Sequence, residues 1–144
     1  MSAASERFET DGPAATEAVG ADLAARLAPG DLVYVLGELG AGKTTLVRGA
    51  CRALGVTGPV TSPTFAIAHR YRARGGLLVA HLDLYRLRSL ADEDPDLLAD
   101  YLGEDRIAFV EWPSAETGAQ LGAPRLTVEL AHLGATRRSI EVRG

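Results

Sequence analysis

The sequence predicts a single α/β domain in which a mostly parallel central sheet is flanked by helices, with an antiparallel hairpin at the C-terminal end. The chain has 144 residues, of which 47% are hydrophobic and 24% charged, which suits one compact core and not two. Short apolar runs of strand length alternate with segments whose apolar residues recur at helical spacing. A glycine-rich loop joins the first such run to the helix after it. We therefore expect residues 1–144 to form one domain.

The N-terminal part predicts a helix, a strand and a second helix. Apolar residues recur at helical spacing over residues 14–27, and a proline-glycine pair ends this helix. Residues 31–36 form a short apolar run that is typical of a buried strand in a parallel sheet. Residues 43–54 contain no proline and place their apolar residues on one face, and Gly55 is suited to end this second helix.

The middle of the chain predicts a β-hairpin. Residues 65–71 alternate like a half-buried strand, residues 74–76 form a turn, and residues 77–84 supply the second strand. Asp83 lies near the end of that strand.

The C-terminal half predicts a short helix, another buried strand and the closing hairpin. The helix covers residues 94–102 and has a proline near its start. Residues 107–112 form an apolar strand that also ends near a carboxylate, and the proline after it prevents the strand from continuing. Residues 125–131 and 138–142 alternate apolar and polar side chains around Gly134, as the strands of an antiparallel hairpin do.

Composition excludes several classes of protein. The formal net charge of −4 makes the surface as a whole a poor match for a polyanion, so we expect any contact with RNA to be local or indirect. Residues 1–7 lack the apolar core of a signal peptide, and no window approaches the ~20 apolar residues of a membrane span. The single cysteine, Cys51, cannot form an internal disulfide. These features predict a cytoplasmic protein with no membrane partner.

The glycine-rich loop matches the Walker A pattern G-x-x-x-x-G-K-[ST], which binds nucleotide phosphates. Its residues are Gly37, Glu38, Leu39, Gly40, Ala41, Gly42, Lys43 and Thr44. Such a loop needs a strand before it and a helix after it, so that its backbone N–H groups curl around the phosphates and the helix N-terminus adds positive potential. Both flanks are predicted here. The fold class is therefore that of a P-loop NTPase, and the alternative is a glycine-rich turn with an exposed lysine.

Lys43 is the only lysine in the chain, whereas the other 14 basic residues are arginines. A compact ammonium suits the space between phosphate groups, and the one lysine occupies that place in the motif. We expect Lys43 to neutralise β- and γ-phosphate oxygens and Thr44 to offer its hydroxyl to Mg²⁺. The predicted ligands are ATP and Mg²⁺.

Hydrolysis requires an acid for Mg²⁺ and a group that orients the attacking water, and the candidates are Glu111 and Asp83. Glu111 is the stronger metal candidate because it ends the most hydrophobic run after the motif. Asp83 could share that work or position the water. The alternative for each is a solvated residue at a strand end. Trp112, the only tryptophan, could stack near the nucleotide, but core burial is favoured from the residues alone.

Two further groups of residues have plainer interpretations. The three histidines, His69, His81 and His132, lie in separate strands without ligand-like spacing, so we interpret them as structural or surface residues and expect no zinc site. Arginines 70, 72 and 74 alternate toward the Gly75-Gly76 turn, where they present a basic edge to an acidic partner or RNA, or act as solvated charges that discourage aggregation.

Four motifs together resemble the bacterial TsaE (YjeE) family in order and spacing. They are GELGAGKTT at residues 37–45, TSPTF at residues 61–65, HLDLYRL at residues 81–87 and VEWP at residues 110–113. The resemblance covers nearly the whole chain, from Thr16 in the first predicted helix to the closing hairpin. Four motifs in register are far more specific than the Walker A pattern alone.

The resemblance implies a P-loop ATPase required to form N6-threonylcarbamoyladenosine in tRNAs that read codons starting with A. Such a protein works with TsaB and TsaD, meets tRNA indirectly through their complex, and does not itself transfer the carbamoyl group.

The resemblance also implies roles for individual residues. Lys43 and Thr44 match the lysine and threonine of the family's P-loop, Glu111 matches the magnesium-binding acid, Asp83 matches an aspartate important for hydrolysis, and Trp112 matches a tryptophan beside the nucleotide. Thr45 belongs to the nucleotide-binding stretch, and the motif at residues 61–64 resembles a switch-like loop that senses the γ-phosphate. The acidic stretch at residues 91–98 departs from the family pattern, in which this helix start commonly carries a glutamate-leucine pair, so the resemblance does not extend to partner docking in this region.

Three other functions are alternatives for a chain with a Walker A loop. A regulatory GTPase needs an Asn-Lys-x-Asp guanine reader, and a chain with no asparagine and one lysine lacks it. A P-loop small-molecule kinase shares the Walker A loop and can use an arginine-rich lid, but an acceptor-binding insert is hard to find here. A non-enzymatic, nucleotide-gated binding module is the third alternative.

Overall fold

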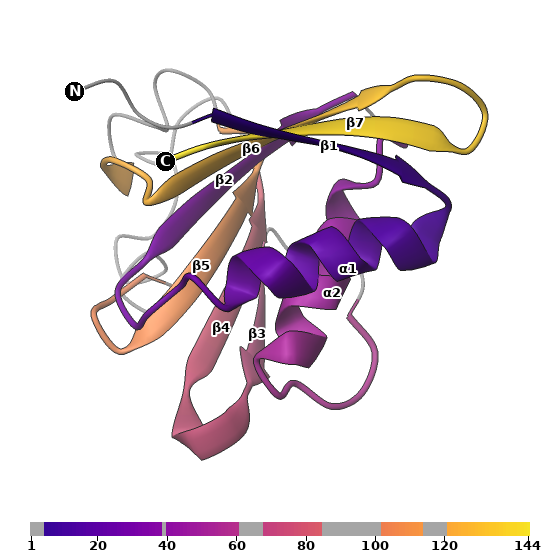
Figure 1. The fold of residues 1–144 in the computed structure, drawn as a ribbon. Helices are drawn as coiled ribbons and strands as arrows, with labels where there is room; N and C mark the ends of the chain where they lie inside the picture. The colour runs from indigo at the N-terminus through magenta and orange to yellow at the C-terminus, as the bar shows by residue number, and fades with distance from the viewer. Residues whose placement is uncertain (1–4, 39, 61–67, 85–101, 114–120) are drawn as a thin grey trace.

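The computed structural model describes residues 5–38, 40–60, 68–84, 102–113 and 121–144 (Figure 1). The switch-like motif at residues 61–64, the acidic stretch at residues 91–98 and most of the predicted helix 94–102 lie outside these ranges. The described elements are β1 (Ser5–Asp11), α1 (Pro13–Ala24), β2 (Leu32–Gly37), α2 (Lys43–Ala53), β3 (Ala68–Arg72), the short 3₁₀ helix η1 (Arg74–Gly76), β4 (Leu78–Asp83), β5 (Arg106–Glu111), β6 (Leu126–His132) and β7 (Arg137–Arg143).

The seven strands form one mixed sheet in the order β1-β7-β6-β2-β5-β4-β3. The four inner strands β6, β2, β5 and β4 run parallel to one another, whereas β7, β1 and β3 join the sheet by antiparallel pairing. The predicted α/β architecture, a sheet flanked by helices, is confirmed. The sheet is less parallel than expected mainly because β1 adds an antiparallel pair at one edge.

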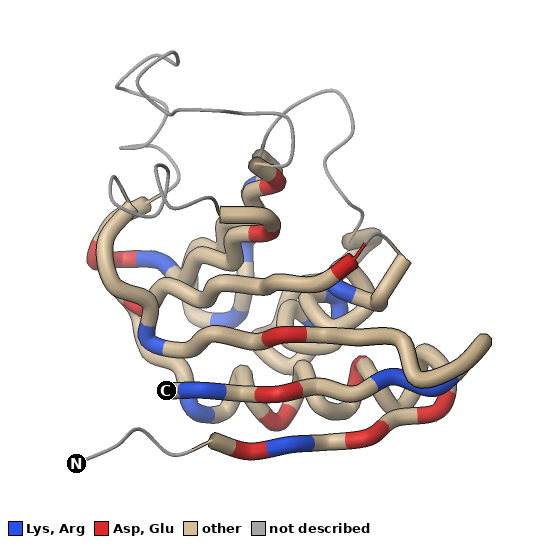
Figure 2. The backbone as a smooth tube through the Cα atoms, turned by 90° about the horizontal axis from the view of Figure 1, so that it is seen from above, with Lys and Arg blue, Asp and Glu red and all other residues tan. Residues whose placement is uncertain are grey.

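Strand β1 was missed because its sequence carries a weak apolar signal. Its burial alternates along the strand, but Phe8 is its one large hydrophobic residue. Phe8 lies opposite Ile140 of β7 and packs against the main core, so one face of the edge strand is anchored. Figure 2 shows acidic and basic positions interleaved along β1 and β7. Charged residues on an edge strand discourage pairing with other chains.

The two helices α1 and α2 lie on the same face of the sheet (Figure 1). The larger core cluster lies between them and that face. It combines Leu23 of α1, Leu46 and Ala50 of α2, and sheet residues that include Val35 and Phe109. A smaller buried cluster covers the other face, where it joins residues of β2, β3, β4 and β5. Strands β2, β4 and β5 thus have buried residues on both faces, as is typical of parallel sheets.

Parallel pairing aligns the carboxyl ends of β2, β4 and β5 at one edge of the sheet. Asp83 at the end of β4 is in register with Glu111 at the end of β5, and Val35 near the end of β2 is also in register with Glu111. The glycine-rich loop begins at the end of β2 and leads into α2. In open α/β sheets, ligands bind beyond the carboxyl ends of the strands.

Candidate functional site

The loop between β2 and α2 uses glycines where other residues would be strained or would clash. Gly40 and Gly42 have positive φ values of 76° and 100°, and Gly42 is the N-cap of α2. At Gly37 a Cβ atom would lie 2.5 Å from the backbone oxygen of Leu130, which is closer than real contacts allow. The loop therefore has the backbone path that a phosphate-binding loop needs. Leu39 lies outside the described residues.

Lys43 is buried at the start of α2, with 5% of its surface exposed. Its Nζ atom donates hydrogen bonds to the backbone oxygens of Gly37, at 2.8 Å, and Glu38, at 2.9 Å. Burial lowers the pKa of the Lys43 ammonium, and the carboxylates of Glu111 and Asp83 oppose that shift. The alternative interpretation, a glycine-rich turn with an exposed lysine, is therefore wrong.

Trp112 lies beside Lys43 and is not a core residue. The Lys43 Nζ atom is 4.3 Å from the centroid of the Trp112 ring, within the range of a cation–π interaction. Trp112 is partly exposed and has a φ of 59°, a left-handed conformation that is unusual for a bulky residue. The preference for core burial is therefore corrected. The backbone turns sharply after β5 and brings the indole to the mouth of the site.

Glu111 is almost fully buried, with 3% of its surface exposed, and connects three elements. Its Oε2 atom accepts a hydrogen bond from the Thr44 hydroxyl of α2 at 3.4 Å. The same Oε2 atom contacts Nε2 of His81, on β4. Asp83, which is in register with Glu111, is partly exposed. The two predicted acids and the predicted magnesium-binding threonine thus meet at one end of the sheet.

His81 is the site residue that sequence reasoning missed. We interpreted the three histidines as structural or surface residues because their spacing did not resemble that of metal ligands. The structure buries His81 against Glu111, whereas the His69 imidazole contacts the Tyr71 hydroxyl. A signal was present in the sequence: His81 and Asp83 are two residues apart on one strand, which places both on the same face. The arginines at 70, 72 and 74 are exposed at the β3 edge.

A cavity of about 290 Å³ lies between the loop and the ends of β4 and β5. The residues that line it are Gly40, Gly42, Lys43, Thr44, Thr45, Asp83, Glu111 and Trp112. Each of them is a residue that the sequence motifs had singled out. Of the remaining loop residues, Gly37 and Glu38 supply the backbone oxygens that hold Lys43, and Ala41 is buried in the main core.

A second cavity, of about 230 Å³, adjoins the loop and shares Gly40, Gly42 and Thr45 with the first. Its other lining residues come from the start of α1 and from the β6–β7 hairpin: Gly12, Pro13, Thr16, Ala135, Thr136 and Arg138. A buried hydrogen bond of 2.9 Å joins the hydroxyls of Thr10 and Thr16. Arg138 donates to the backbone oxygen of Gly40 at 3.3 Å. Sequence reasoning did not find this cavity, because residues from both ends of the chain form it.

The donor set of the first cavity suits Mg²⁺ bound together with phosphate. Its lining residues include two threonines and two acids, whose oxygens are hard ligands. Among the described residues, no group of three or more histidines, cysteines and acids forms a metal site by itself. Mg²⁺ commonly takes one or two carboxylates, with substrate phosphates and water completing its shell. The residues present fit that pattern.

Comparison with known proteins gives consistent results. The family model described as threonylcarbamoyl adenosine biosynthesis protein TsaE matches residues 10–140. The tRNA threonylcarbamoyladenosine biosynthesis protein TsaE of Streptomyces coelicolor is 50% identical over 95 residues, which are 65% of this chain and 64% of that protein. The protein of the same name from Bacillus subtilis is 37% identical over 135 residues, which are 93% and 82% of the two chains.

A solved structure shares the fold. The crystal structure of YdiB from Bacillus subtilis aligns with a TM-score of 0.78 and 30% sequence identity, and the alignment covers 100% of this chain and 88% of that one. The chain spans just under two thirds, 64%, of the length of the relatives from Streptomyces coelicolor and Synechocystis. Within the described part of the chain, no helix has the length and apolar character needed to cross a membrane.

Proposed function

The chain belongs to the TsaE family, and from this premise we propose that it is a magnesium-dependent ATPase required to form N6-threonylcarbamoyladenosine in tRNAs that read codons starting with A. It acts in the cytoplasm with TsaB and TsaD, and it meets tRNA through their complex. The observation that carries the proposal is the convergence of Lys43, Thr44 and Glu111 on one cavity beside the glycine-rich loop.

Lys43 and the loop backbone supply the phosphate-binding part of the site. The Lys43 ammonium contacts two backbone oxygens of the same loop and the face of Trp112. A phosphate oxygen is a charged acceptor and would form a stronger hydrogen bond with this ammonium than a carbonyl does. Trp112 lines the same cavity and would lie beside a nucleotide bound there, as the family resemblance implies.

Thr44, Glu111 and Asp83 form the metal and hydrolytic part. Thr44 and Glu111 lie close enough to hold one Mg²⁺ between them, directly or through water. Bound Mg²⁺ neutralises charge that develops on the transferred phosphoryl group. Asp83 lines the same cavity and is more exposed than Glu111, which suits a residue that orients the attacking water. The second cavity adjoins the loop on the α1 and β6–β7 side and would hold the nucleoside.

The surface supports indirect contact with tRNA. The net charge is −4, and the acidic and basic positions of the outer strands β1 and β7 are interleaved (Figure 2). Neighbouring charges of opposite sign cancel within the Debye length of about 8 Å, so these strands offer no extended positive surface to a polyanion.

The test combines ATP hydrolysis with tRNA modification in the presence of purified TsaB and TsaD. We expect Lys43→Ala and Glu111→Ala to lower both activities by about 100-fold or more, since each removes an interaction with the reacting phosphates or their metal. Two matched controls should keep both activities. They are Arg52→Ala, on the exposed side of helix α2, and Glu129→Ala, on the exposed surface of the sheet.

Unchanged tRNA modification by both site variants would contradict the proposal. Transfer of a labelled γ-phosphate from ATP to a small metabolite would instead support the small-molecule kinase. Nucleotide binding without turnover, even with TsaB and TsaD present, would support a nucleotide-gated binding module.

A further inference from the structure

We propose that His81 is a positioning residue that holds the Glu111 carboxylate in the orientation in which it serves Mg²⁺, an inference that rests on the proposed function. The imidazole of His81 is fully buried, and its Nε2 atom is in hydrogen-bonding contact with Oε2 of Glu111. Residues that ligate metals are held in place by hydrogen bonds from residues behind them. His81 supplies such a bond from the interior of the sheet.

The strand register explains how the imidazole reaches this position. His81 of β4 is in register with Phe109 of β5, and Asp83 is in register with Glu111. Alternate residues of a strand point to the same face, so His81 and Glu111 are diagonal neighbours on the face that carries α2. The fully buried imidazole reaches the Glu111 carboxylate, and Glu111 also lines the cavity together with Asp83 and Trp112.

The hydrogen-bond partners of the buried ring indicate which nitrogen carries the proton. Nδ1 of His81 has no hydrogen-bond partner in the described part of the chain. A proton on Nδ1 would therefore be a buried donor without an acceptor, and an unprotonated Nε2 would direct a lone pair at a carboxylate oxygen. The neutral imidazole with its proton on Nε2 avoids both problems. In this form, His81 donates a hydrogen bond to Oε2 of Glu111.

The hydrogen bond makes the two oxygens of Glu111 unequal. The His81 imidazole and the Thr44 hydroxyl both contact Oε2, so Oε1 remains as the oxygen without a recorded partner among the described residues. A carboxylate held by one oxygen cannot rotate freely, and its other oxygen keeps one direction. Positioning of this kind reduces the rearrangement needed when a metal binds.

A role in packing alone accounts poorly for a histidine here. The ring brings two polar nitrogens into the core, and the described residues provide a partner for one of them. Leucine has a similar volume and no polar atom to desolvate, so it would fill the same space at lower cost. This position instead carries a polar ring, and among the described residues that ring is hydrogen-bonded to Glu111.

The experiment measures ATP binding by calorimetry, on the full chain, as a function of Mg²⁺ concentration and also in EDTA. His81→Leu removes the donor, and His81→Gln keeps an N–H group at similar reach. We expect His81→Leu to require about 10- to 100-fold more Mg²⁺ for the same ATP affinity, with unchanged ATP binding in EDTA. We expect His81→Gln to restore the Mg²⁺ requirement to within a few-fold of wild type.

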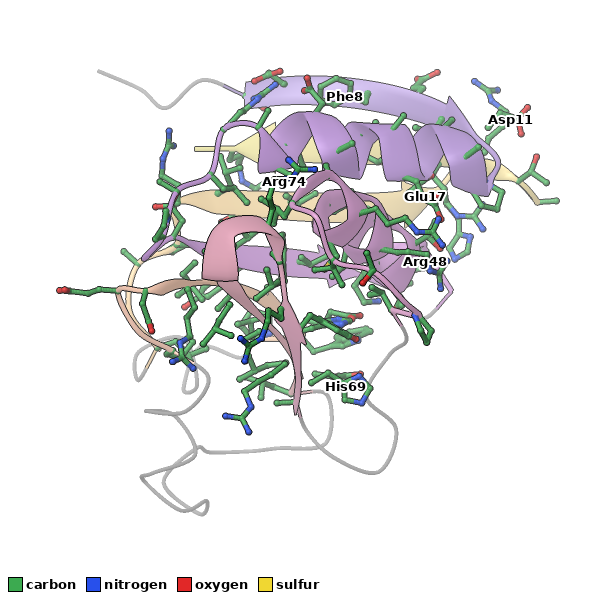
Figure 3. The ribbon with its side chains drawn as sticks, turned by 90° about the horizontal axis from the view of Figure 1, so that it is seen from below. Phe8, Asp11, Glu17, Arg48, His69 and Arg74 are labelled. Carbon is green, nitrogen blue, oxygen red and sulfur yellow. The ribbon has the colours of Figure 1, made fainter. Side chains whose placement is uncertain are left out.

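His69→Leu and His69→Gln are matched controls. His69 of β3, labelled in Figure 3, is the register partner of His81. Its imidazole contacts the Tyr71 hydroxyl at 3.1 Å. Both substitutions should leave the Mg²⁺ requirement at the wild-type value. An equal effect of His69→Leu and His81→Leu would mean that the sheet was loosened and would overturn the proposal.

Two further outcomes would also overturn it: a wild-type Mg²⁺ requirement in folded His81→Leu, or a His81→Gln variant no better than His81→Leu. If His81→Leu does not fold, the nitrogen NMR signals of the wild-type imidazole decide, and a proton on Nδ1 instead of Nε2 contradicts the inference. If wild-type ATP binding does not depend on Mg²⁺, the proposed function fails as well. A failure confined to the His81 variants leaves the proposed function intact.

Discussion

The α1–α2 interface and the polar end of the sheet are built on opposite principles. At the interface the two helices approach so closely that backbone meets backbone, and hydrocarbon fills the remaining space. At the polar end, Lys43, His81 and Glu111 are buried together, and one imidazole nitrogen has no partner among the described residues. Together with Thr16, which lines the second cavity, and its hydrogen-bond partner Thr10, they are the buried polar or charged residues of the described part of the chain.

The difference separates stability from function. Apolar burial and close packing stabilise the fold, whereas a buried charge or an unpaired polar atom costs free energy. The chain buries its charged and polar side chains beside the glycine-rich loop and around the cavities. The proposed function assigns phosphate and metal to the same places. Substitutions at the interface should therefore change the free energy of unfolding strongly, and substitutions in the site should change it weakly while they abolish activity.

The largest effect on stability is expected for Gly49→Ala. A Cβ atom at Gly49 would lie 2.0 Å from the backbone oxygen of Glu17, so α1 and α2 would have to separate. We expect a loss of about 3 kcal/mol or more in the free energy of unfolding, measured by urea denaturation. In a helix without such a contact, replacing glycine by alanine stabilises by about 1 kcal/mol. A loss of stability at Gly49 would therefore by itself support the close approach of the two helices.

The same substitution at Gly134 is the matched control. No atom lies within 4 Å of a Cβ built there, in the β6–β7 hairpin, so we expect a change within about 0.5 kcal/mol. Equal effects at Gly49 and Gly134 would show that the helices are not in backbone contact. The ion pair of 3.6 Å between Glu17 and Arg48 links the two helices at the same place (Figure 3).

A smaller effect is expected for Thr16→Val, beside the second cavity. The substitution keeps the shape of the side chain but removes the hydroxyl that bonds to Thr10. The Thr10 hydroxyl is then buried without this partner, which should cost about 1–2 kcal/mol. Adding Thr10→Val should recover part of the loss, because both polar groups are then gone. The control Thr136→Val removes an exposed hydroxyl and should change stability by less than about 0.5 kcal/mol. If the effects of Thr16→Val and Thr10→Val were additive, the hydrogen bond between the two hydroxyls would be contradicted.

Cys51 tests the apolar character of the interface through pH. Burial in α2 raises the pKa of its thiol from 9.0 to about 12. The unfolded chain therefore releases this proton at lower pH than the folded chain, so the thiol stabilises the fold fully below pH 9.0 and this stabilisation is lost as pH rises toward 12. Cys51→Ala should make the decline of stability above pH 9.0 less steep, as measured by urea denaturation across that range. An identical slope in the variant would show that the thiol is accessible in the folded protein.

Among the site residues, a small net effect on stability is expected for Lys43→Met. The substitution removes the cost of burying an ammonium, which is the main cause of the lowered pKa of Lys43, but it also removes two hydrogen bonds to the loop. These effects oppose each other, so we expect a change within about 1 kcal/mol, together with loss of ATP binding measured by calorimetry. A large loss of stability would show that Lys43 supports the fold and would remove the contrast between the two regions.

Local sequence pattern predicted the parts of the fold that depend on neighbouring residues. The Walker A loop could be recognised because eight consecutive residues carry its chemistry, and the two helices beside it follow from apolar spacing. Asp83 and Glu111 could be named as acids near strand ends. Strand β1 could not, because a single large apolar residue, Phe8, gives too weak a signal without its partner β7.

By itself, therefore, the sequence determined the α/β class, the glycine-rich loop, its single lysine and the resemblance to a family. Only the tertiary structure decided which distant residues meet. His81 and Glu111 are 30 residues apart, and Thr44 and Glu111 are 67 apart, yet strand register and the position of α2 bring all three together. Such contacts depend on how strands pair across the sheet, and the alternation of side chains along one strand does not specify its neighbour.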